Sequence, residues 1–164
     1  ELFIQAHALA RLEERMDGMD IGILHFSLFC SCKSPEIRRN HHGEWLFAFR
    51  LMDVKTGYFI ADIIGHKIIF RTFLFLTHNG TPEGEKLNKL IGLKKEDKEW
   101  LNIDKLSTFL NSDITRDARL RQLFIEAGCE PLFAVAQELS ISEQMKPEKQ
   151  MADFIVRYLR LGDK

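Results

Sequence analysis

One histidine and two arginines near the start of the chain have the spacing needed to act together. His7, Arg11 and Arg15 recur every four residues, so a helix would place them on one face with Glu14 beside them. An imidazole can accept or donate a proton, and guanidinium groups bind phosphate through paired hydrogen bonds. These residues are therefore candidates for acid–base chemistry on a phosphate ester. A solvated helix face on which Glu14 pairs with Arg11 would have the same pattern.

A second group of charged residues falls in a stretch with strand periodicity. Arg50, Asp62 and Arg71 are expected to share one face of a sheet with Lys67. Two guanidinium groups that flank one carboxylate can bind a phosphodiester, or they can simply neutralise that carboxylate. We predict that Arg50 and Arg71 stabilise a phosphate or a transition state, while His7 acts as general acid or base. A terminal helix packed over this face would instead favour a structural salt bridge.

A compact basic segment precedes the strands. Arg38, Arg39, His41 and His42 lie in a polar stretch over residues 33–43 that is rich in turn residues, which predicts a loop. Such a loop can follow a nucleic-acid backbone, although exposed basic loops also occur in proteins without this partner. Adjacent histidines can bind a metal, but no cysteine or carboxylate stands at a zinc-site spacing, so no metal site is predicted. The sequence contains no glycine-rich phosphate loop and no nucleophile elbow, and no cofactor is predicted.

The strands that must position these residues follow from hydrophobic alternation. Apolar residues recur with a period of two over residues 44–77, which predicts three antiparallel strands in a meander. A two-residue turn at Gly65-His66 and a longer loop over residues 53–57 would connect them. This register collects the apolar side chains on one face and leaves a polar, net-basic face. The predicted pairs are Ile64 with Lys67, Ile60 with Arg71, and Met52 with Tyr58.

Helical periodicity flanks the strands on both sides. Helices are predicted over residues 3–16 and 20–29, and again through most of the C-terminal half. The residues expected to begin the later helices are Thr81, Asp104, Thr115, Pro131 and Pro147. The last helix has an apolar stripe that can dock a partner, pair with a second copy or cover the sheet. Its members are Met151, Phe154, Ile155, Tyr158 and Leu159.

Length and composition favour one folded domain of the α+β class. The 164 residues are 45% hydrophobic and 29% charged, as in ordinary globular proteins. We expect a single domain over 1–164, with an α/β core over 1–80 and a helical extension over 81–164. The net charge of −1 argues against a generally basic nucleic-acid binder, although it allows a local basic patch. Three cysteines without a disulfide framework, and no apolar run near the roughly 20 residues of a membrane span, predict a cytoplasmic protein with no membrane contact.

The N-terminal half also resembles a known group of proteins. The order of two helices and a three-stranded meander, opened by the segment HALARLEER at residues 7–15, is similar to small bacterial domains related to the RelE and BrnT toxins. The resemblance covers residues 3–77 and implies RNA cleavage by basic and acid–base residues on one sheet face. It also implies that the polar face of the first helix lies beside Arg50 and Arg71. The long helical C-terminal half departs from those compact toxins.

Two hypotheses of different classes follow. The first is an RNA-interacting, toxin-like domain acting as a metal-independent ribonuclease. The second is a noncatalytic module that binds a protein partner or a second copy of itself through the last helix. For the first hypothesis, the residues predicted to contact RNA are Arg11, Arg15, Arg38, Arg39 and Lys67.

Overall fold

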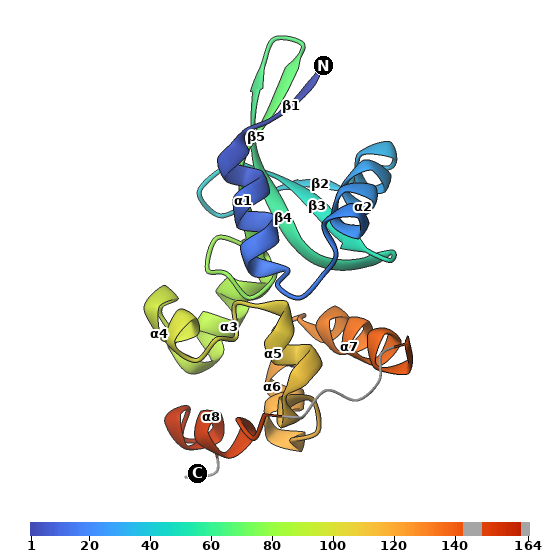
Figure 1. Ribbon diagram of the computed structural model, residues 1–164. Coiled ribbons are helices and arrows are strands. Elements are labelled where there is room, and N and C mark those ends of the chain that lie inside the picture. The colour runs from blue at the N-terminus through green and yellow to red at the C-terminus, as the bar shows by residue number, and fades with distance from the viewer. Residues whose placement is uncertain (143–148, 162–164) are drawn as a thin grey trace.

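The computed structural model describes residues 1–142 and 149–161 (Figure 1). In chain order the described elements are β1 (Leu2–Ile4), α1 (Ala6–Arg15), α2 (Ile21–Lys33), β2 (Ile37–Arg39), β3 (Trp45–Leu51), β4 (Val54–Ile64), β5 (Lys67–Phe75), α3 (Pro82–Ile91), α4 (Lys95–Trp100), α5 (Leu106–Asn111), the 3-10 turn η1 (Asp113–Thr115), α6 (Ala118–Glu126), α7 (Glu130–Ser142) and α8 (Ala152–Tyr158). The predicted α+β class is confirmed.

The sheet has more strands than the sequence suggested. Five strands lie in the order β1-β5-β4-β3-β2, with β1 parallel to β5 and all other neighbours antiparallel. The predicted meander corresponds to β3, β4 and β5, at the centre of this sheet. The two added edge strands have three residues each, which is too short for alternation to be visible in the sequence. One of them, β2, lies within the predicted loop over residues 33–43.

The hairpin of β4 and β5 has the predicted turn, but the register of its strands differs from the prediction farther from the turn. Ile64 pairs with Lys67 across the two-residue turn, as expected. The predicted pairing of Ile60 with Arg71 is wrong, because a β-bulge lies between Ile60 and Ala61 and shifts the register. Ile60 pairs with Thr72, and Arg71 is the extra residue of the bulge.

The turn of the other hairpin, between β3 and β4, is shorter than predicted. Leu51 pairs with Val54, so the turn consists of Met52 and Asp53 and not of a loop over residues 53–57. Both turn residues have positive φ, 48° and 65°, as a twisted two-residue hairpin turn requires. The predicted pairing of Met52 with Tyr58 is therefore wrong. Neither turn residue is glycine, so the usual sequence signal for this turn was missing.

Both faces of the sheet are apolar at their centre, which corrects the expectation of one polar face. The phenylalanines of the three long strands share one face and stack on one another, as the contacts of Phe59 with Phe70 and Phe73 show. The opposite face carries residues that are also buried, namely Leu46, Ala48, Tyr58, Ile60 and Leu74. The charged residues described on this opposite face lie around that centre, with Arg50 and Lys55 near the β3–β4 turn and Asp62 and Arg71 beside the start of β3.

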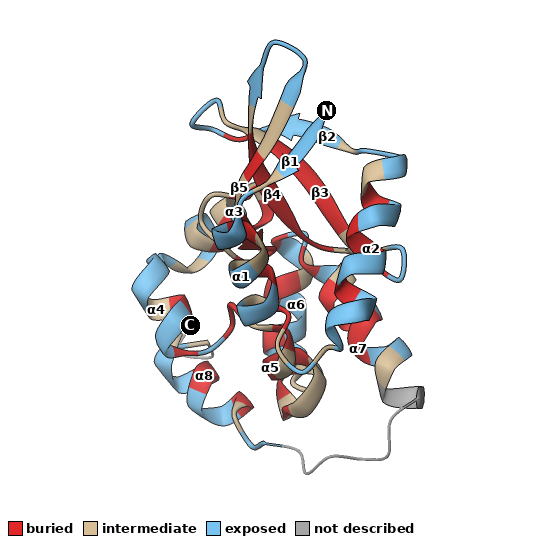
Figure 2. Cartoon of the chain, turned by 45° about the horizontal axis from the view of Figure 1, so that its top comes forward, coloured by how far each residue is buried: buried red, intermediate tan, exposed pale blue. Residues whose placement is uncertain are grey.

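Helices cover the two faces from different parts of the chain. α1 packs on β5 and α2 packs on β3, and together they cover the phenylalanine face (Figure 1). α7 contacts β4, and α3 supplies Glu83, whose carboxylate accepts a hydrogen bond from Tyr58 on the opposite face. The C-terminal helices gather at one end of the sheet, and one cluster of buried residues extends from the sheet into them (Figure 2).

The predicted helix starts are confirmed in part. Thr81 caps α3 by accepting a hydrogen bond from the Gly84 amide, and Gly92 ends that helix in a left-handed conformation. Asp104 does not cap α5, because its carboxylate is bound by Arg15 of α1. α6 is capped by Asp117 and not by Thr115. The helix expected from Pro147 begins at Ala152, and residues 147 and 148 lie outside the described part.

The stripe of the last helix is largely used within the chain itself. Ile155 is fully buried, while Phe154 and Tyr158 both lie against the ring of Trp100 in α4. The Tyr158 hydroxyl also donates a hydrogen bond to Asp97. Phe154 and Tyr158 nevertheless remain 50% and 41% exposed, and binding of a partner through this helix stays a prediction. Within the described residues, no helix is long and apolar enough to cross a membrane.

Candidate functional site

The structure does not bring the predicted catalytic residues together. His7 is exposed on α1, which packs on the phenylalanine face of the sheet, whereas Arg50 and Arg71 belong to the opposite face. Arg71 nevertheless lies on the same face as Arg50, because the bulge turns its side chain toward Asp62, 3.1 Å away. They lie toward opposite ends of it, however, because Arg71 contacts Glu44 just before β3 and Arg50 lies near the end of that strand. The six residue steps from Glu44 to Arg50 span roughly 20 Å.

The other arginines of the N-terminal helix have structural partners. Arg11 pairs with Glu14 at 2.6 Å, as the alternative interpretation of this helix proposed. Arg15 is mostly buried and binds Asp104, which ties α1 to the segment before α5. Both guanidinium groups are therefore paired with carboxylates of the chain itself, and neither needs a ligand to balance its charge.

Arg50 belongs to a separate ionic network. It pairs with Glu36 at 2.8 Å, and Lys55 reaches both Glu36 at 3.4 Å and Glu83 at 3.2 Å. Burial raises the pKa of the adjacent Tyr58 to about 12, so its hydroxyl stays protonated and donates to Glu83. This network joins the start of β2, the β3–β4 hairpin and α3.

The remaining predicted RNA contacts are spread over the surface. Arg38 lies 3.7 Å from a carboxylate oxygen of Glu36, and Lys67 lies over the ring of Phe3 at the distant end of the β4–β5 hairpin. Arg39 stacks on the indole of Trp45, with its guanidinium carbon 4.1 Å from the ring centre. Of this set, Arg39 lies nearest to the site described next.

A different site is built on the tight turn between β2 and β3. Asn40 opens the turn and is almost fully buried, at 8% exposure. Its side-chain oxygen accepts hydrogen bonds from the amides of His42 and Glu44, and the Gly43 amide closes the turn onto the Asn40 carbonyl. Asparagine in the first position and glycine in the fourth favour such a turn. The two histidines therefore occupy its central positions.

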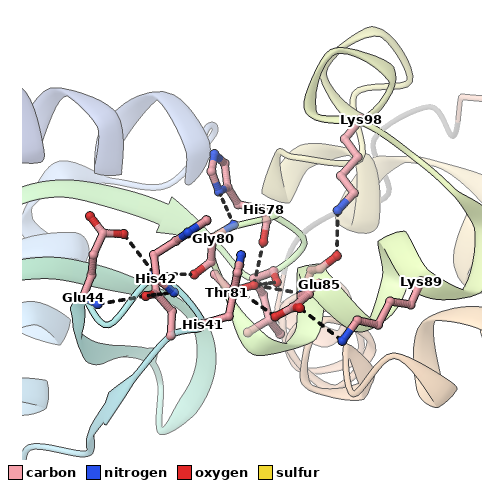
Figure 3. A network of polar contacts seen from close by, with 12 residues as sticks. His41, His42, Glu44, His78, Gly80, Thr81, Glu85, Lys89 and Lys98 are labelled. Atoms are coloured by element: carbon pink, nitrogen blue, oxygen red, sulfur yellow. Dashed lines mark hydrogen bonds and ion pairs between the residues drawn. The ribbon is translucent and has the colours of Figure 1, made fainter.

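The same asparagine connects this turn to a distant one. Its side-chain amide donates to Glu44 at 3.0 Å and to the carbonyl of Gly80 at 3.1 Å. Gly80 lies in the turn between β5 and α3, where its own amide donates to Nδ1 of His78. The two turns are thus held side by side, together with the first residues of α3 (Figure 3).

His41 is oriented by a carboxylate from α3. Its Nδ1 lies 2.9 Å from Oε2 of Glu85, while the other oxygen of Glu85 pairs with Lys89 at 3.1 Å (Figure 3). The hydrogen bond and the positive charge of Lys89 hold the pKa of Glu85 below its ordinary value despite slight desolvation. A carboxylate on Nδ1 favours the neutral tautomer with the proton on that nitrogen, which leaves Nε2 free as a base. His42 packs against His41 with the ring centres 3.8 Å apart.

These residues line an open pocket of about 460 Å³. Its floor is the apolar pair Ile60 and Leu74, and its polar walls come from the two turns and α3. A volume of this size is within the range of small-ligand sites. A second hollow adjoins it through His42 and Glu44 and is lined by Arg71. Arg71 pairs there with Glu44 at 3.2 Å and with Asp62 at 3.1 Å.

The third histidine of the pocket is kept neutral. Burial, and then the nearby charges of Lys95 and Lys98, lower the pKa of His78 to about 4. Lys98 itself is buried, and its ammonium donates to the carbonyls of Thr77 and Gly84 at 2.7 and 2.9 Å and to the side chain of Asn79. The lysine therefore fixes the loop that carries His78. With Nδ1 occupied by the Gly80 amide, the ring presents a neutral N–H at Nε2.

The sequence predicts His41 and His42 as parts of a basic loop, without a metal or a catalytic role, and it predicts no role for Glu85. The partners come from segments more than 40 residues apart, so no local spacing could have revealed the pair. The one local signal was Asn40-His41-His42-Gly43, whose turn chemistry predicts that both histidines point outward.

Among the described residues, no group of three or more histidines, cysteines, aspartates or glutamates is placed to hold a metal ion. The three cysteines are free thiols. No protein-family model, curated protein or solved structure matches the chain.

The neutral His78 predicts how stability depends on acid. Between about pH 6.5 and pH 4 the unfolded chain binds a proton at this residue and the folded chain does not, so stability falls as the pH falls. Asparagine at this position can still accept the Gly80 hydrogen bond but cannot titrate. His78→Asn should reduce the loss of unfolding free energy between about pH 6.5 and about pH 4.5 by about 2 kcal/mol. Urea unfolding at the two pH values measures this, and equal losses in both proteins would contradict it.

Proposed function

We propose that the chain is an RNA-interacting protein whose histidine pocket cleaves RNA by acid–base catalysis without a metal. The observation that supports this best is the 2.9 Å contact between His41 Nδ1 and Glu85 on the wall of an open pocket. An imidazole oriented by a carboxylate, with its second nitrogen free, is the geometry of a general base. The adjacent His42 supplies a second proton-carrying group at the same place.

The proposed reaction uses the hydroxyl that distinguishes RNA from DNA. Nε2 of His41 takes the proton of a ribose 2′-hydroxyl, whose oxygen attacks the neighbouring phosphorus. The bond from phosphorus to the 5′-oxygen breaks, and that oxygen takes a proton from His42. Arg71 and the neutral Nε2–H of His78 are the donors available to the phosphate oxygens. The products are a 2′,3′-cyclic phosphate and a free 5′-hydroxyl.

Of the residues that the sequence predicted to be catalytic, only Arg71 has a role in the proposed site. Arg71 remains a phosphate-binding residue, because it borders the hollow next to His42. Arg50 is left out because its network lies at the other end of the face, and the role of His7 passes to His41. The resemblance to RelE- and BrnT-related toxins agrees with RNA as the substrate, and with a place of action in the bacterial cytoplasm.

Cleavage of a short single-stranded RNA tests the proposal. His41→Ala should lower the cleavage rate by about 100-fold or more, because general acid–base catalysis contributes 10² to 10⁴. Glu85→Gln should lower it less, since the imidazole remains but is poorly oriented. A 2′-deoxy substitution at the cleaved nucleotide should abolish cleavage and leave binding intact. The measurement is product formation on gels, with chelator present to exclude contaminating metal nucleases.

Two matched variants serve as controls for this experiment. His66→Ala removes a histidine from the β4–β5 turn, and His7→Ala removes the one that the sequence pattern favoured. Both proteins should cleave at the wild-type rate. Cleavage that depends on His7 and not on His41 would refute the assignment, and absence of any RNA binding would refute the function.

The salt dependence of binding gives an independent check. Arg71 and Lys89 are the two cations at the pocket rim, and each already pairs with a carboxylate. Neutralising two phosphates of single-stranded RNA predicts a slope of log K against log salt of about −1.4, which Arg71→Ala should reduce to about −0.7. Fluorescence anisotropy measures these slopes. Lys67→Ala, at the far end of the hairpin, should leave the slope unchanged, and the reverse pattern would contradict the location of the site.

A further inference from the structure

The outward face of α2 is apolar, although it faces solvent. Phe26 is 67% exposed and Phe29 is 56% exposed, while Leu24 and Leu28 on the inward face are buried. Even the serines of this helix point inward, and Ser31 bonds to the backbone of Arg50 in β3. The two serines thus face inward, whereas the solvent face carries large apolar side chains together with His25 and Lys33, which is unusual for an exposed helix face.

The exposed stripe runs straight along the helix. Gly22, Phe26, Phe29 and Lys33 recur at intervals of four, three and four residues, so they form one line. Ile21 and Ile23 flank it, at 52% and 44% exposure. Contiguous exposed apolar surface of this kind marks an interaction site.

We propose that this face pairs with the same face of a second copy of the chain, with the two α2 helices antiparallel. A two-fold axis midway between Phe26 and Phe29 would place Phe26 of each copy against Phe29 of the other copy. Lys33 of each copy would then lie opposite Gly22 of the other copy. Because glycine has no side chain, it leaves room for the lysine. Such a contact is isologous and closes as a dimer.

The charges at the ends of the stripe favour this orientation over a parallel one. Lys33 lies at the C-terminal end of α2, and Asp20 caps its N-terminus through hydrogen bonds to the amides of Gly22 and Ile23. The helix between them contains no other charged residue. Antiparallel pairing therefore brings each Lys33 to the Asp20 of the other copy, whereas parallel pairing would place like charges together. Antiparallel packing also aligns the helix dipoles favourably.

The size of the patch sets the expected affinity. The two phenylalanines and two isoleucines expose on the order of 400 Å² of apolar surface per copy. Since about 65% of a homodimer interface is apolar, the whole interface would bury about 1,200 Å² over both copies. This is the lower end of the range for specific interfaces, so a dissociation constant on the order of micromolar is expected.

Light scattering after size exclusion tests the dimer on the full chain. At about 200 µM, well above the expected dissociation constant, the mass should approach twice the 19.1 kDa of one chain. Phe26→Asp should raise the dissociation constant by about 30-fold or more, as expected for a central contact residue. Ile64→Asp, which changes an apolar side chain of 62% exposure on β4, is the matched control and should leave the dimer intact.

The orientation has its own test. Lys33→Glu would place two carboxylates together at each end of the contact and should weaken the dimer several-fold. Adding Asp20→Asn, which keeps the helix cap, should restore part of the affinity. Circular dichroism confirms that each variant is folded. A monomer at about 200 µM, a dimer that persists in Phe26→Asp, or no recovery in the double variant would overturn the proposal.

Discussion

The side chain of Asn40 holds together two turns that are forty residues apart in the sequence. Its side-chain oxygen accepts from the amides of His42 and Glu44, and its side-chain amide donates to the Glu44 carboxylate and to the Gly80 carbonyl. All four hydrogen-bonding positions of the side chain are therefore used. Because this amide is buried, each unmade bond would leave a desolvated polar group and cost about 1–3 kcal/mol. The geometry of His41, His42 and Glu85 depends on this connection.

The sheet explains why the site lies where it does. Both of its faces are buried at the centre, so polar chemistry is confined to the edges and strand ends. At one such end the two turns and α3 surround the buried pair Ile60 and Leu74, which form the apolar floor of the pocket. Gly84 lets α3 approach closely, since a Cβ there would lie 1.8 Å from the His78 carbonyl oxygen. The pocket is thus a consequence of how α3 docks on the end of the meander.

Local patterns predicted the elements well, and contacts between distant segments poorly. Alternation over residues 44–77 identified three strands, and Thr81 and Gly92 correctly bounded α3. The register failed because the bulge at Arg71 and the turn at Met52 follow from tertiary packing, not from strong turn residues. The assumption of one polar face then joined His7 to arginines on the opposite side of the sheet. Periodicity could not show that helices from the C-terminal half cover that side.

The proposed RNA site lies where these two turns meet. The most direct measurement is a nuclear magnetic resonance titration of the ¹⁵N-labelled chain with a short RNA made uncleavable by 2′-deoxy substitution. We expect the largest shift changes at the amides of residues 40–44 and 78–80 and the first turn of α3, with a further change at the Arg71 side chain. Changes confined to α1 or to the tip of the β4–β5 hairpin, or no changes at all, would contradict the account.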